Sequence, residues 1–99
     1  MLVIERLISQ SVLVGLMKIT VNWVSRGKVC LHICEDSRPS RWHEVEPEQV
    51  IELDEDVTCM VTGLTGSGVR LGITAPASVR ILRTELEDLP PPRKKSRRR

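Results

Sequence analysis

Hydrophobic and polar residues alternate along most of the chain with a period of two. Four runs place their apolar side chains on one face: KITVNWV, KVCLHIC, DVTCMVTG and GVRLGIT. This period is typical of a strand that buries one face. The segments SRGK and GLTGSG separate the runs in pairs and predict hairpin turns. The pattern therefore predicts an all-β fold.

The first half of the chain resembles the second half. Residues 11–33 align with residues 49–73, with the second hairpin turn two residues longer than the first. The matched pairs lie 38 residues apart before the turn and 40 apart after it: Val12 with Val50, Trp23 with Val61, and Val29 with Val69. A three-stranded meander is marginally stable alone, but two can bury their apolar faces against each other. We therefore predict one small β-sandwich or barrel-like domain over residues 1–89, with copy one at about 1–38 and copy two at about 39–89.

Composition supports a small domain with an aliphatic core. The 99 residues contain two tryptophans and no Phe or Tyr, so Val, Ile, Leu and Met must fill the interior. Glu5 and Arg6 interrupt the first apolar stretch, and no basic segment precedes it, so neither a signal peptide nor a membrane span is expected. Three cysteines form no disulfide framework, which favours the cytoplasm.

The net charge of +2 hides a division between body and tail. The segment PPPRKKSRRR holds six of the 15 basic residues, which leaves 9 basic against 13 acidic residues in the body. Residues 90–99 are expected to be a disordered tail that either contacts phosphates without sequence preference or keeps the protein soluble. The tail cations are Arg93, Lys94, Lys95, Arg97, Arg98 and Arg99. Seven acids lie between residues 44 and 56, so selective binding of a polyanion needs a local patch.

Catalytic and metal chemistry find little support. Cys30, His32 and Cys34 alternate on one face of a predicted strand, and soft ligands of this kind suggest zinc. Alternate strand positions lie about 7 Å apart, however, and no second pair of ligands completes the site. We expect half-exposed strand residues here, and Cys59 in the core. Because no phosphate loop, nucleophile triad or carboxylate pair stands out, we expect no enzyme, no metal and no cofactor.

Two segments resemble the carbon storage regulator (CsrA/RsmA) family of bacterial RNA-binding proteins. VRLGITAPASVRILRTEL resembles the family's Arg-Ile-Gly-Ile-x-Ala-Pro motif and the strand that follows it, and MLVIERL resembles the family's opening strand. The resemblance touches residues 1–34 and about 47–88. It implies an intertwined dimer in which the first and fifth strands of one chain flank the three middle strands of the other. RNA, typically a GGA-containing loop, lies where a first strand meets the partner's fifth strand.

In this chain the resemblance implies a dimer folded from one polypeptide, and so a monomeric pseudo-dimer. No clear fifth strand follows Cys34, and SRWHEV (40–45) matches a first strand poorly, so one RNA site is expected rather than two. A helical turn is predicted over 84–89. Two outer pairings are predicted: residues 1–7 with 68–74, and residues 78–84 with either 49–53 or 11–15.

The resemblance assigns the RNA contacts to Ile4 and Arg6 on the first strand and to Ile81 and Arg83 on the fifth. Arg83 is the strongest candidate because a guanidinium offers a planar fork of donors and stacks on unpaired bases. The alternative is a solvated charge that protects a sheet edge.

Other positions depart from the family pattern or lie beside the motif. Leu7 replaces a basic residue, Leu82 replaces His, and Thr84 replaces Glu. Arg70 and Arg80 are expected to face water.

Three functions remain open. The first is a post-transcriptional regulator that binds GGA-type loops in mRNA or small RNA, with a protein antagonist as a further candidate partner. The second is a protein-interaction module that modulates a CsrA-type regulator or an assembly partner and binds RNA weakly or not at all. The third is a nonspecific nucleic-acid binder that depends on the basic tail.

Overall fold

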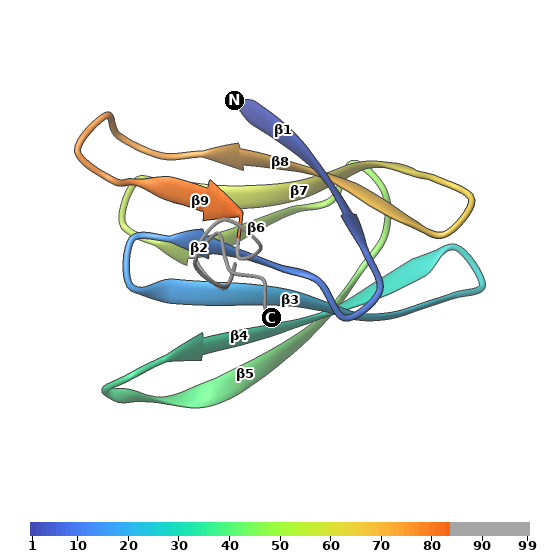
Figure 1. Ribbon diagram of the computed structural model, residues 1–99, viewed down its shortest axis with the longest axis horizontal. Coiled ribbons are helices and arrows are strands. Elements are labelled where there is room, and N and C mark those ends of the chain that lie inside the picture. The colour runs from blue at the N-terminus through green and yellow to red at the C-terminus, as the bar shows by residue number, and fades with distance from the viewer. Residues whose placement is uncertain (84–99) are drawn as a thin grey trace, which may run out of the picture.

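Two antiparallel sheets pack face to face in the computed structural model, which describes residues 1–83 (Figure 1). The four-stranded sheet has the order β1-β8-β7-β6, and the five-stranded sheet has the order β5-β4-β3-β2-β9. The strands of the described residues are β1 Leu2–Leu7, β2 Ser11–Val14, β3 Met17–Ser25, β4 Lys28–Glu35, β5 Arg38–Val45, β6 Val50–Asp54, β7 Val57–Leu64, β8 Gly68–Thr74 and β9 Ile81–Arg83. The predicted all-β fold is confirmed.

Each half of the chain contributes an outer strand to the sheet of the other half. β1 pairs with β8, so the predicted pairing of residues 1–7 with 68–74 is confirmed. β9 pairs with β2, which confirms the predicted pairing with 11–15 and excludes 49–53. The two meanders are therefore interleaved, and Figure 1 shows β9 beside β2 and β1 beside β8.

One aliphatic cluster fills the space between the two sheets. Its members come from the alternating runs of both halves. They are aliphatic side chains together with Met17 and Cys59, and neither tryptophan is among them. The largest side chains with almost no exposure are Ile19, Leu31 and Ile33 from the five-stranded sheet, and Leu71 and Ile73 from the four-stranded sheet. Cys59 is buried in this core, as predicted.

β5 forms where SRWHEV (40–45) was expected to be a poorly matching first strand of the second half. Residues 38–45 pair with β4, with Leu31 opposite His43 and Val29 opposite Val45. Only Val45 is fully buried in β5, so its sequence carries little apolar alternation. The strand forms at the sheet edge, where backbone pairing with β4 holds it and polar side chains reach solvent. It occupies the place of a first strand for the second half.

The paired registers also correct the alignment of the two halves. Val21 lies opposite Leu31 and Val61 lies opposite Leu71, so equivalent residues are 40 apart already before the turn. A bulge follows in both strands, and the residue equivalent to Trp23 is Gly63 rather than Val61. Both hairpin turns have the same length, since Val24 pairs with Val29 and Leu64 pairs with Val69. Trp23 continues the apolar alternation of Ile19 and Val21, so the alternation did not reveal the bulge between Val21 and Trp23.

Two predictions about the C-terminal part of the chain concern residues that the structure does not describe. The helical turn over 84–89 and the basic tail over 90–99 lie outside residues 1–83. Among the described residues, no helix is long and apolar enough to cross a membrane.

Candidate nucleic-acid interface

β1 turns the two predicted contact residues of the first strand toward the interior. The side chain of Ile4 is 7% exposed and that of Arg6 is 5% exposed. The opposite face of β1 carries Val3 and Leu7, which are exposed. Both faces of MLVIERL carry apolar residues, so the sequence held no clear signal for the face that is buried.

Arg6 is held by hydrogen bonds to backbone carbonyl oxygens. Its Nε donates to the oxygen of Glu5 at 2.8 Å, and its Nη1 donates to the oxygen of Ser11 at 3.2 Å. A buried guanidinium needs such acceptors because an unpaired charge is costly in the interior. The Ser11 hydroxyl also shares a 2.7 Å hydrogen bond with the hydroxyl of Thr20, which fixes the start of β2.

β9 pairs with the segment of β2 that directly follows Ser11, the acceptor of the hydrogen bond from Arg6. Arg83 pairs with Val12, the residue after the Ser11 that accepts the hydrogen bond from Arg6. Ile81 pairs with Val14 and packs against the core as a half-buried residue. The structure thus brings the backbone positions of the first-strand and fifth-strand candidates to one short segment. The side chain of Arg83 lies outside the described part of the chain.

Backbone contacts fix the course of the chain into β9. The amide of Val79 donates to the carbonyl of Pro76 at 2.9 Å, so the Ala-Pro segment makes a turn. The amide of Gly15 donates to the carbonyl of Arg80 at 2.7 Å, which extends the pairing of β9 with β2. Arg80 and Arg70 are both exposed, as predicted.

Gly68 allows β1 to approach β8 closely. A Cβ atom at this position would meet the carbonyl oxygen of Arg6 and would lie 2.8 Å from the Cα of Leu7. These neighbours are backbone atoms, which cannot rotate away. The glycine therefore helps to set the position of the strand that carries Arg6.

The opposite end of the sandwich holds β5 and β6 and differs from the β1–β9 end. Val45 lies opposite Val29, as Arg6 lies opposite Val69, so a fully buried valine takes the place of the arginine. No strand within residues 1–83 pairs with the outer edge of β6. The buried arginine of β1 and the outer strand β9, which meet at Ser11 and Val12 at one end, thus have no counterpart at the other end within residues 1–83.

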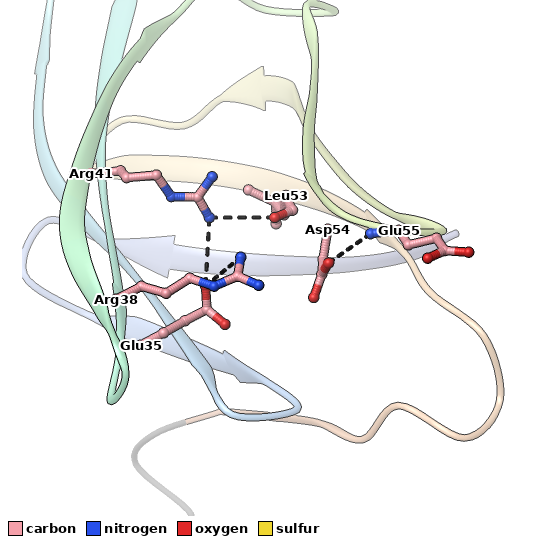
Figure 2. Close-up of polar contacts among 6 residues, drawn as sticks. All are labelled: Glu35, Arg38, Arg41, Leu53, Asp54 and Glu55. Carbon is pink, nitrogen blue, oxygen red and sulfur yellow. Dashed lines mark hydrogen bonds and ion pairs between the residues drawn. The ribbon is translucent and has the colours of Figure 1, made fainter.

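Arginine side chains lie beside the unpaired edge of β6. The Nη2 atom of Arg41 donates to the carbonyl oxygen of Leu53 at 3.3 Å and lies 3.8 Å from a carboxylate oxygen of Glu35 (Figure 2). Arg38 approaches the same oxygen of Glu35 at 3.6 Å. The guanidinium of Arg41 therefore binds a backbone carbonyl of β6 and connects β5 with β6 at this end. Its role here is structural.

The cysteine and histidine face of β4 has a different character. Within the described residues, no three His, Cys, Asp or Glu side chains are grouped to hold a metal ion. Burial raises the pKa of the Cys30 thiol, a hydrogen bond with Asn22 lowers it, and the charge of Glu44 raises it. Cys34 on the same face is exposed.

Sequence reasoning missed an aromatic pair on this face. The rings of His32 and Trp42 lie with centroids 4.3 Å apart at an interplanar angle of 36°. Trp42 is 59% exposed. The pair depends on β5, and the weak strand signal of that segment hid it.

Comparison with known protein families finds a match for the second half of the chain. Residues 46–89 match the family model CsrA, described as the global regulator protein family. No curated protein and no solved structure matches the chain significantly. Within residues 46–83, the match includes β6 to β9, and thus the strand that pairs with β2.

Proposed function

Residues 46–89 belong to the CsrA family, which indicates an RNA-binding post-transcriptional regulator, and from this premise we propose that the protein reads a GGA-containing loop. The proposed site is the edge formed by β1 and β9. The RNA is a messenger leader or a small RNA, and the cytoplasm is the proposed place of action.

The observation that carries the proposal is the convergence of β1 and β9 on Ser11 and Val12. Arg6 donates to the carbonyl of Ser11, and Arg83 pairs with Val12. Recognition of a single-stranded loop requires donors fixed at a place that unpaired bases can reach. In this proposal Arg83 supplies the base contact, Arg6 holds the strand edge in position, and Ile4 and Ile81 support both from below.

We also propose that the chain is a duplicated, single-chain form of the family dimer. The support is the constant offset of 40 residues across both hairpins, together with the exchange of outer strands between the halves. Because Val45 replaces the arginine and β6 has no outer partner among residues 1–83, one RNA site operates per monomer.

A protein-interaction module is the second candidate function, and the exposed face of β1 favours it. Val3 and Leu7 on this face are 49% and 42% exposed, and Leu2, which begins the strand on the side of Ile4 and Arg6, is 47% exposed. Exposed apolar side chains of this kind, on the strand that the RNA proposal needs, suit a protein surface such as that of an antagonist or of a CsrA-type regulator.

The test compares a GGA hairpin with a hairpin of scrambled loop sequence in a gel-shift titration. We expect Arg83→Ala to weaken binding of the GGA hairpin by about 1–3 kcal/mol, the scale of one good base contact, and to remove the preference over the scrambled loop. Arg80→Ala is the matched control, because it removes an exposed arginine three residues away and should leave the preference unchanged.

The proposal fails if Arg83→Ala keeps the GGA preference. It also fails if the unmodified protein binds both hairpins alike. If neither hairpin binds, but the protein captures a CsrA-type regulator through Leu2, Val3 and Leu7, the interaction module replaces it.

A further inference from the structure

We infer that Trp42 and His32 form a second RNA-contact site, on which an unpaired base outside the GGA triplet stacks. This inference rests on the proposed function and extends it, because it assigns a place to the single strand that leaves the β1–β9 edge. The ligand is a nucleobase of single-stranded RNA, without a requirement for its sequence.

The aromatic pair is exposed and already ordered. Trp42 on β5 lies directly opposite His32 on β4, and the ring centroids are 4.3 Å apart. Tryptophan normally buries a large apolar area, yet this ring is 59% exposed and takes no part in the core. An exposed aromatic surface that needs no rearrangement is the platform on which unpaired bases stack.

A row of side chains connects the pair with the proposed site. Cross-strand pairing places Ser11 opposite Thr20, Thr20 opposite His32, and His32 opposite Trp42. The row begins at the residue that accepts the hydrogen bond from Arg6. Its exposure rises along the way, from a buried Ser11 through half-buried Thr20 and His32 to the exposed Trp42.

The length of this row suits a short stretch of RNA. Three spacings between neighbouring strands amount to about 14 Å from Ser11 to Trp42. Stacked nucleotides advance about 3.4 Å each along one strand, so about four of them cover the distance. An unpaired base four positions from the GGA triplet can therefore reach Trp42 while the triplet occupies the β1–β9 edge.

The surroundings of Trp42 favour a base over a protein. The contacting ring is that of His32, and the nearest same-face residue along β5 in the next row is the exposed Glu44. Protein hot spots of tryptophan are enclosed by further contacts that exclude water, whereas this ring has polar neighbours. Lys18 pairs with Cys34, whereas Glu44 pairs with Cys30 on the other side of the His32–Trp42 row, so no cation lies directly beside the carboxylate in these rows and stacking rather than phosphate attraction supplies the affinity.

The experiment uses the full chain and two RNAs, a bare GGA hairpin and the same hairpin with its loop extended by four unpaired nucleotides on both sides of the GGA. We expect the extension to tighten binding by about five- to 150-fold, the range for one stacked base. Trp42→Ala should abolish this gain and leave the affinity for the bare hairpin unchanged. Trp42→Phe, which keeps a stacking ring, should retain most of it. A Trp23→Phe background assigns the accompanying fluorescence quench to Trp42.

Each alternative outcome overturns the inference. Equal weakening of both RNAs by Trp42→Ala, or no gain from the extension in the unmodified protein, excludes a separate stacking site. Self-association that Trp42→Ala removes, without an effect on RNA, assigns the ring to a protein contact. If the GGA hairpin does not bind at all, the proposed function fails, and an unstructured oligoadenylate then tests the platform alone. Absence of its fluorescence quench would exclude stacking.

Discussion

Replacement of Gly68 by alanine tests whether the position of β1 controls both stability and RNA recognition. The new Cβ would meet the carbonyl oxygen of Arg6 and would lie 2.8 Å from the Cα of Leu7 and 2.9 Å from the carbonyl carbon of Arg6. Carbon atoms pack at about 3.5–4.0 Å, so β1 must shift by about 1 Å. Overpacking of this kind typically costs about 1–3 kcal/mol, which we expect as the loss of free energy of unfolding in a urea titration.

The same shift should weaken the binding of the GGA hairpin. The hydrogen bond from Arg6 to Ser11 is already 3.2 Å long, so a further displacement of about 1 Å breaks it. Gly66→Ala is the matched control, because it lies in the same hairpin and its Cβ would have no neighbour within 4 Å. Equal urea midpoints for the two variants would refute the packing argument. A destabilised Gly68→Ala that binds RNA with unchanged affinity would show that recognition does not depend on the position of β1.

Three further predictions concern other parts of the chain. His43→Ile should raise the free energy of unfolding by about 1–3 kcal/mol, because the Nε2 atom of His43 is buried without a hydrogen-bond partner among the described residues; a lower urea midpoint would contradict this. Burial raises the pKa of Cys59 to about 12 and also raises that of Cys30, so at neutral pH both remain protonated and a disulfide reagent should label exposed Cys34 first; fast labelling of all three thiols in the native protein would be inconsistent with this burial. Deletion of residues 90–99 should weaken GGA and scrambled hairpins alike and flatten the salt dependence by about 0.7 per lost phosphate contact, and loss of the GGA preference alone would assign recognition to the tail.

The strand pairings that close the fold could be predicted because strong apolar alternation defined the meanders. The exchange of β1 and β9 between the halves followed from the family resemblance, and the registers confirm it. The segment of β5 matched a first strand poorly, because Arg41 and His43 occupy positions where a two-sided strand would carry apolar residues. An edge strand tolerates them, since one side of it remains in solvent. The sequence shows the residue types at such positions, but it does not show whether another strand covers them.

The candidate site was predictable in its location and less so in its details. The motif placed Ile4, Arg6, Ile81 and Arg83 on two strands, and the structure brings those strands to one segment of β2. The burial of Ile4 and Arg6 depends on which face of β1 meets the core. The position of Trp23 after its bulge could not be predicted either, because Trp23 continues the apolar alternation of Val21 and so hides the bulge.

The exchange of outer strands sets an order of events during synthesis of the protein. Leu2 pairs with Ile73, and Val12 pairs with Arg83, so the earliest and latest parts of the described chain depend on each other. Loop closure over such separations slows folding, but it occurs within one molecule and does not depend on protein concentration. β1, with exposed Leu2, Val3 and Leu7, is synthesised before the other described strands and remains without its partner until Gly68–Thr74 has been made. The nascent chain therefore carries an unpaired apolar strand through most of its translation, and chaperone demand should peak before the final strands appear.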